Sequence, residues 1–161
     1  MLVPAILYKD EIHKNMQKYF YTEDMLLETG CMGNWCPEIS DCPNDGNIQY
    51  AIVDNNGKLI GILFYWIDWY ADSVSRFGLF SFDRGNPVIG KDLFEELERL
   101  IKRHRRIEWR MVGGNPVEKH YDKFCFKYNG KKHVLKDGIR DRDGSYRDDV
   151  IYEILKERER K

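Results

Sequence analysis

The segment from Phe77 to Lys102 most constrains what this chain can fold into, because it joins three elements without a long connection. The apolar run Phe77–Phe82 predicts a strand, and the apolar spacing between Leu93 and Ile101 predicts a helix. The loop between them, from Arg84 to Gly90, contains glycine and proline. Glycine lets loop N–H groups turn toward an anion, and a helix N-terminus adds unpaired N–H groups. The segment predicts an anion cradle, although an ordinary connection would use similar residues.

Composition places the chain among ordinary globular proteins. Its 161 residues are 42% hydrophobic, which suits a single domain over residues 1–161. The formal net charge is -1, so no overall field favours nucleic acid or an anionic membrane as a partner. No apolar run is long enough to span a membrane, and the first residues lack the features of a leader. We therefore expect a soluble, cytoplasmic protein.

Three of the four cysteines, Cys31, Cys36 and Cys42, lie in a segment rich in glycine and proline, and the fourth is Cys125. They form no CxxC pair, and no adjacent histidine completes a zinc site. We expect reduced thiols and no metal. The segment itself, residues 30–47, is long for a loop in a compact domain, and we expect it beside a substrate pocket.

A hairpin is predicted from Ile48 to Asp68, where two apolar runs flank Asn56-Gly57. In a two-residue Asn-Gly turn both residues take positive φ. The second run is apolar on both faces, which is typical of a central strand. At its end, Trp66, Asp68 and Trp69 are candidates to hold a cationic amine by ring-face attraction and charge. The alternative is a packed sheet end with solvated carboxylates.

A second strand and helix follow the anion cradle. Residues Arg106–Val112 alternate between apolar and polar side chains, which predicts a strand with one polar face. After it, Asn115 is expected as the helix N-cap, with Pro116 at the first helical position and Glu118 closing a capping box. Tyr121 then lies on the apolar face of this helix.

Asn115 followed by residues 121–126, YDKFCF, resembles the N…YxKxGF element of the GNAT N-acetyltransferase superfamily. The order of the predicted elements agrees with that family. A helix over Asp10–Leu27, broken near Thr22, precedes the hairpin, the cradle and the second strand and helix, and a strand pair over residues 132–139 and 147–155 closes the chain. The resemblance covers nearly the whole chain and implies the GNAT fold, an α/β domain with a central mixed, mostly antiparallel twisted sheet flanked by helices.

The chain departs from the family pattern in both motifs. The family loop reads Arg or Gln, two residues, Gly, one residue, Gly or Ala, whereas Arg84 stands one residue too far from Gly90. Pro87 also lacks an N–H. In the later motif a cysteine replaces the usual glycine, and Asn115 is one residue closer to Tyr121 than is common. The register of the loop on a pyrophosphate is therefore left open.

The resemblance implies an acetyl-CoA-dependent N-acetyltransferase in which a primary amine attacks the acetyl group directly in a ternary complex. The alternative is a GNAT-fold module that binds CoA or a partner without turnover. Tyr121 is implied as the acid that protonates the leaving thiolate. For the base that deprotonates the amine, Glu108 is the first choice, with Asp83 and Asp68 as rivals.

Acetyl-CoA is expected to contact the end of the cradle strand, the loop, the start of its helix and the later motif. These residues are Phe80, Ser81, Phe82, Arg84, Gly85, Asn86, Val88, Ile89, Gly90, Lys91, Asn115 and Lys123. A nucleic-acid partner using the basic run from Lys102 to Arg106 is the third class, and the near-zero net charge argues against it. The acceptor amine and the oligomeric state are left open, with a homodimer among the alternatives.

Overall fold

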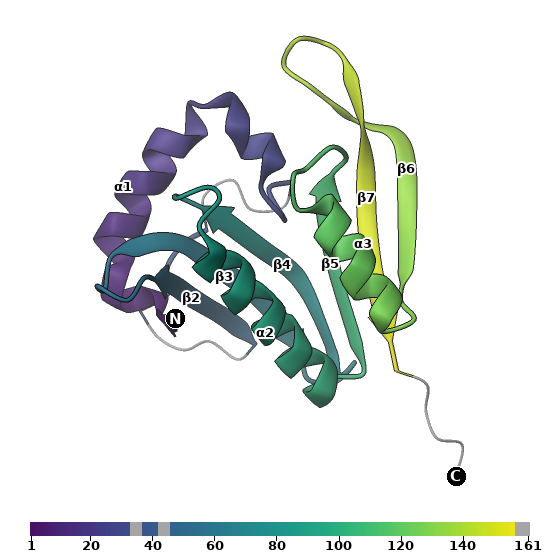
Figure 1. Ribbon diagram of the computed structural model, residues 1–161, viewed down its shortest axis with the longest axis horizontal. Helices are drawn as coiled ribbons and strands as arrows, with labels where there is room; N and C mark the ends of the chain where they lie inside the picture. The colour runs from purple at the N-terminus through teal and green to yellow at the C-terminus, as the bar shows by residue number, and fades with distance from the viewer. Residues whose placement is uncertain (33–36, 42–45, 157–161) are drawn as a thin grey trace.

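Figure 1 shows the computed structural model, which describes residues 1–32, 37–41 and 46–156. The described residues form a seven-stranded sheet in the order β1-β2-β3-β4-β5-β7-β6. The strands are β1 (Leu2–Pro4), β2 (Asn47–Val53), β3 (Leu59–Asp68), β4 (Ser73–Ser81), β5 (Arg106–Val112), β6 (Lys131–Arg140) and β7 (Tyr146–Leu155). The helices are α1 (Lys9–Phe20), α2 (Pro87–Arg103) and α3 (Glu118–Lys127), with short 3-10 helices η1 (Ala5–Tyr8) and η2 (Glu23–Leu27). No helix of the described chain is both long and apolar enough to cross a bilayer.

The sheet separates two apolar cores. In Figure 1, α2 and α3 lie on the near face of the sheet, and α1 lies at the edge formed by the N-terminal strands. The apolar stripe of α2, including Leu93 and Leu97, packs under one face, while Ile12 and Met16 of α1 pack on the other core with Phe80. All neighbouring strands are antiparallel except β4 and β5. The predicted mixed, mostly antiparallel sheet flanked by helices is confirmed.

The predicted strand, loop and helix of the cradle are present, but the helix begins earlier than expected. It starts at Pro87, so residues 88–91 lie in its first turn and not in the loop. Asn86 is the N-cap, and its side chain accepts a hydrogen bond from the Val88 N–H at 3.0 Å. An asparagine cap followed by proline at the first helical position satisfies or removes N–H groups that would otherwise be free. The loop is thereby shortened to residues 82–86.

The hairpin turn between β2 and β3 is longer than the predicted two-residue turn. Of the pair, Gly57 has a positive φ of 79°, and Asn56 does not. The Asp54 carboxylate accepts the backbone N–H groups of Asn56 and Lys58, at 2.8 and 2.9 Å. The aspartate side chain thus organises a wider turn that needs left-handed backbone only at the glycine.

The N-cap of α3 differs from the prediction. The cap position is Val117, with no side-chain cap, and the helix begins at Glu118. The Asn115 side chain instead bridges two segments, because it accepts the Val117 N–H at 3.0 Å and donates to the Leu27 carbonyl at 2.5 Å. Glu118 accepts the Gly114 N–H and not that of Asn115. Asn115 therefore links the segment before α3 to the end of η2.

The parallel strands β4 and β5 pair only over part of their length. Pairing ends at Phe77 with Trp109, whereas β4 continues to Ser81, and Figure 1 shows the two strands separating toward their C-terminal ends. Residues Leu27–Gly30, which we call the insert, lie in the gap. The Leu79 N–H donates to the Thr29 carbonyl at 3.0 Å, and the Gly30 N–H donates to the Arg110 carbonyl at 2.8 Å. The insert satisfies backbone groups that the two strands do not satisfy for each other.

Gly30 provides a test of how tightly the insert is held. A Cβ at Gly30 would lie 2.5 Å from the Phe77 carbonyl oxygen, whereas a Cβ at Gly85 has no atom within 4 Å, and both glycines have positive φ. We expect Gly85→Ala to lower the free energy of unfolding by about 1–2 kcal/mol, from backbone strain alone. Gly30→Ala should lower it by about 3 kcal/mol or more, because a clash with backbone is added. Urea unfolding of both variants measures the difference. Equal decreases in the free energy of unfolding would show that the insert shifts easily to make room for the added methyl group.

Candidate active site

A groove of about 280 Å³ lies between the end of β4 and the N-termini of α2 and α3. Gly85 and Gly90 border it with open space where a Cβ would stand, so any other residue at these positions would project into that space. This is the backbone approach that a phosphate-bearing ligand needs. Seven of the residues predicted to hold acetyl-CoA line the groove: Ser81, Arg84, Gly85, Asn86, Ile89, Gly90 and Asn115.

The other five predicted cofactor residues do not line the groove. Phe80 stacks on Phe64 in the second core, and the Phe82 N–H donates to the Ile60 carbonyl. Val88 is half-buried in α2, Lys91 pairs with Glu95, and Lys123 is exposed on α3. Because successive strand residues turn their N–H groups to opposite sides, only Ser81 of the three predicted strand residues faces the gap. The Leu79 N–H also faces the gap, although Leu79 was not among the residues predicted to contact acetyl-CoA.

Glu28 occupies the end of this groove and was not anticipated from the sequence. Its carboxylate is 4% exposed and accepts the Ser81 N–H at 2.9 Å and an Arg84 guanidinium N–H at 3.1 Å. Burial raises the pKa of Glu28, and both donors oppose that rise. An acid following the apolar residues of η2 gives no sequence signal for this position. The Ser81 N–H, which the sequence resemblance assigns to acetyl-CoA, is therefore bound by the protein's own carboxylate.

Tyr121 lies behind the insert, on the inner face of α3 as predicted. It is fully buried against Trp109, and its hydroxyl lies 2.9 Å from the Thr29 hydroxyl. Burial raises the pKa of Tyr121 well above its usual value, so the phenol stays protonated at neutral pH. Tyr121 does not itself line the groove, but Thr29 does. The arrangement keeps a proton donor one hydroxyl away from the groove.

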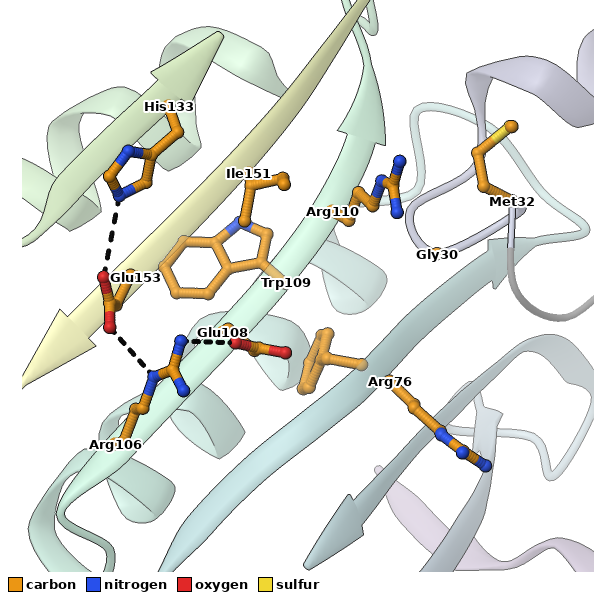
Figure 2. Close-up of a pocket in the computed structure, with 11 residues that line it drawn as sticks. Gly30, Met32, Arg76, Arg106, Glu108, Trp109, Arg110, His133, Ile151 and Glu153 are labelled. Carbon is orange, nitrogen blue, oxygen red and sulfur yellow. Dashed lines mark hydrogen bonds and ion pairs between the residues drawn. The ribbon is translucent and has the colours of Figure 1, made fainter. Parts of the chain in front are cut away.

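A larger pocket, of about 730 Å³, lies over β4, β5 and β7. Figure 2 shows Glu108 on β5 inside this pocket, with its carboxylate next to the Arg106 guanidinium at 2.9 Å. Arg106 also donates to Glu153 of β7 at 2.9 Å. Gly30 of the insert borders the pocket, whereas Thr29 borders the groove. The groove and the pocket therefore lie on either side of the Thr29–Gly30 peptide, in the gap between β4 and β5.

The residues expected to bind the acceptor lie outside this pocket. Trp66 borders a smaller pocket of about 200 Å³. Asp68 caps the turn between β3 and β4 by accepting the N–H groups of residues 70 and 71. Trp69 is 62% exposed beside His104. Asp83, a rival base, accepts the side-chain N–H of Asn86 in the loop. Their contact with an acceptor stays a prediction.

The cysteine segment is only partly described. Cys36 and Cys42 lie outside the described residues, so the expectation about their thiols has no structural counterpart here. Cys31 and Cys125 are buried free thiols. Among the residues that the structure describes, no three histidine, cysteine or acidic side chains are grouped as a metal site requires.

The buried charge of Glu28 predicts a pH-dependent stability. Because the pKa is raised above its usual 4.5 in the folded state, the folded chain is favoured when this group is protonated and loses that contribution as the pH rises through the raised pKa. Glu28→Gln mimics the protonated form. We expect the variant to gain stability relative to wild type at pH 7 and to lose this advantage below about pH 4. Urea unfolding at both pH values checks this, and a destabilised variant at pH 7 would mean that the pairing with Arg84 outweighs burial.

By sequence, no protein-family model and no curated protein matches the chain. Solved structures do. A probable GNAT-family acetyltransferase from Chromobacterium violaceum has a TM-score of 0.61 and 12% identity, over 96% of this chain and 85% of that one. Mutant forms of spermidine/spermine N-acetyltransferase SpeG from Vibrio cholerae have a TM-score of 0.56 and 18% identity, over 70% and 68%. The ribosomal-protein-S18-alanine N-acetyltransferase from Escherichia coli has a TM-score of 0.56 and 15% identity, over 74% and 76%. The chain has the fold of the GNAT N-acetyltransferases, as the sequence resemblance predicted.

Proposed function

We propose that this protein is an acetyl-CoA-dependent N-acetyltransferase in which a primary amine attacks the acetyl group directly. The observation that carries the proposal is that the groove and the pocket lie on either side of Thr29–Gly30, inside the gap between β4 and β5. Two reactants held on opposite sides of one gap can be brought together without a covalent enzyme intermediate. The structural neighbours include enzymes named for a polyamine and for a protein alanine, which supports an amine as the acceptor.

The groove residues fit the cofactor by their chemistry. The Gly85 loop and the N-terminal turn of α2 offer backbone close to an anion, and Arg84 adds a positive charge beside them. The Ser81 and Leu79 N–H groups face the gap as main-chain donors. When bound, acetyl-CoA supplies an activated thioester. The protein then has to orient the amine and move two protons.

Proton transfer is assigned to two residues on opposite sides of β5. Glu108 accepts the proton that the ammonium must lose before it can attack. Tyr121 gives its proton toward the leaving sulfur, through the Thr29 hydroxyl that lies 2.9 Å away. Glu108 lies in the pocket and Tyr121 lies behind the groove, so acid and base do not neutralise each other. The Ser81 or Leu79 N–H stabilises the negative charge that develops on the acetyl oxygen.

The second candidate is a GNAT-fold module that binds CoA or a partner without turnover. It is favoured by the occupied donors of β4, since the Glu28 carboxylate holds the Ser81 N–H and the Thr29 carbonyl holds that of Leu79. A catalytic complex requires these contacts to open. The cytoplasmic location and the single-domain organisation expected from the sequence stay predictions.

Tyr121→Phe tests the proposed catalytic role of Tyr121. The variant keeps the buried ring but loses the hydroxyl that faces Thr29, so we expect thiol release from acetyl-CoA with an amine panel to fall about 100-fold or more. Acetyl-CoA affinity, measured by calorimetry, should stay within about twofold of wild type, since Tyr121 does not line the groove.

The matched control is Tyr152→Phe, which removes the hydroxyl of another fully buried tyrosine in the same aromatic cluster. The Tyr152 hydroxyl donates to Asp122, away from the insert, so its loss should leave turnover nearly unchanged. Equal rates for wild type and Tyr121→Phe would remove Tyr121 from catalysis. Acetyl-CoA binding without turnover on any amine would favour the non-catalytic module.

Glu28 provides a separate test of cofactor binding. Since its carboxylate holds the Ser81 N–H and adds negative charge to the groove, Glu28→Gln should bind acetyl-CoA more tightly, by about tenfold. Calorimetric titration of wild type and variant measures the change. The control is Glu95→Gln, an exposed acid on α2 whose charge is paired with Lys91. Weaker binding by Glu28→Gln alone would show that Glu28 supports the cofactor site and does not compete for it.

A further inference from the structure

We propose that the acceptor is an amine that also carries an acid group, and that the 730 Å³ pocket recognises both of its charges. This inference rests on the proposed acetyl transfer and assigns its substrate class. The proposal is based on the distribution of charge in the pocket, which has one negative cluster and, apart from it, one positive residue. A ligand with opposite charges at its two ends matches that pattern.

The negative cluster lies on β5 and β7. Arg106 bridges two carboxylates, those of Glu108 and Glu153, at 2.9 Å each. Two acids and one base leave this cluster with a formal charge of -1. Figure 2 shows the three side chains as a connected row, with His133 at its end, 3.6 Å from Glu153. An ammonium group next to Glu108 would complete the charge balance and would stand beside the proposed base.

The positive residue is Arg76 of β4. It borders the same pocket, is exposed, and makes no ion pair with any carboxylate of the described residues. Its guanidinium carbon lies 5.9 Å from the centroid of the Trp66 ring. Figure 2 shows the Arg76 side chain directed away from Glu108, so these two charges do not satisfy each other. A guanidinium with free N–H groups binds a carboxylate or a phosphate in a bidentate manner.

The backbone at Arg76 indicates that its direction is built into the sheet. Arg76 has a positive φ of 51°, and the pairing of β4 with β5 shifts register between Val74 and Phe77. A non-glycine residue in the left-handed region inside a central strand costs about 1–2 kcal/mol. Bulges of this kind re-aim a side chain and are frequent next to active sites. Arg76 stands at this irregularity, between Val74 and Phe77, which both face the first core.

The third arginine of the pocket does not change this balance. Arg110 forms a two-pronged ion pair with Asp149, a carboxylate that is 1% exposed, so its charge is already compensated. The described pocket is therefore neutral as a whole but divided into a negative and a positive end. Between the charged side chains, Met32 and Ile151 add apolar lining. A polyamine would place a cation against Arg76, which disfavours that class of acceptor.

The test compares matched amines with wild type and Arg76→Gln. For a carboxylate the pair is leucine and leucinamide, for a phosphate it is phosphoethanolamine and ethanolamine, and spermidine represents the polyamines. We expect kcat/KM of the wild type to fall about 10- to 100-fold in Arg76→Gln for the preferred acid-bearing amine, and less than about twofold for its neutral partner. Each amine is compared between proteins, so its own pKa cancels. Arg103→Gln, an exposed arginine at the end of α2, is the control and should change neither value.

Calorimetric binding of the same amines without acetyl-CoA separates the two proposals. Binding of an acid-bearing amine that Arg76→Gln abolishes, with no turnover, would support the pocket assignment while the proposed enzyme fails. The carboxylate and phosphate pairs show which acid group is used. Turnover of neutral amines or spermidine as fast as the acid-bearing amines would overturn the inference, and so would equal losses for both members of a pair in Arg76→Gln. The inference would also be overturned if none of the acid-bearing amines bound and if Arg76→Gln had no effect.

Discussion

The early end of the pairing between β4 and β5 is the constraint on which the rest of the site depends. Two strands in the middle of a sheet normally satisfy each other's backbone groups, and beyond Phe77 and Trp109 these two do not. Unpaired N–H and carbonyl groups at that depth need other partners. The insert supplies them through Thr29 and Gly30, and the gap that it fills lies between the groove on one side and the pocket on the other.

The insert also makes the proposed site self-occupied. A ligand that takes the Ser81 N–H has to replace Glu28, so the exchange conserves the hydrogen bond and changes only its acceptor. Burial disfavours the charged form of the Glu28 carboxylate, and the pKa of this group is therefore raised. If a cofactor binds only when the insert is open, its observed affinity is its intrinsic affinity multiplied by the fraction of molecules in which the insert is open. The proposed enzyme and the non-catalytic module would then differ only in how readily the insert opens.

The aromatic cluster on the helix side of β5 holds the Tyr121 ring through contacts that do not involve the insert. Its ring contacts Trp109 and Tyr152 at centroid distances of 5.4 and 5.7 Å, and neither of these side chains belongs to the insert. Stacked and tilted rings of this size fix orientation through packed area. On the opposite face of β5 the side chains are charged, so alternation along this strand places Glu108, the proposed base, on the face away from Tyr121, the proposed acid.

Periodicity and turn chemistry in the sequence determined strands β2 to β7, the long helix α2, and the position of Tyr121 on the inner face of α3. These features depend on neighbours within a few residues. The glycine loop was also predicted, and five of its residues line the groove: Arg84, Gly85, Asn86, Ile89 and Gly90.

Tertiary structure alone decided the remaining features. Asn115 donates to the carbonyl of Leu27, 88 residues away, and Arg76 stands at an irregularity in the pairing of two strands. Glu28 and Thr29 have no local signal, because their role arises from a gap between two strands that lie far along the chain. A sequence pattern reports which face of an element is apolar, but backbone groups left unpaired between elements become visible only when those elements are placed together.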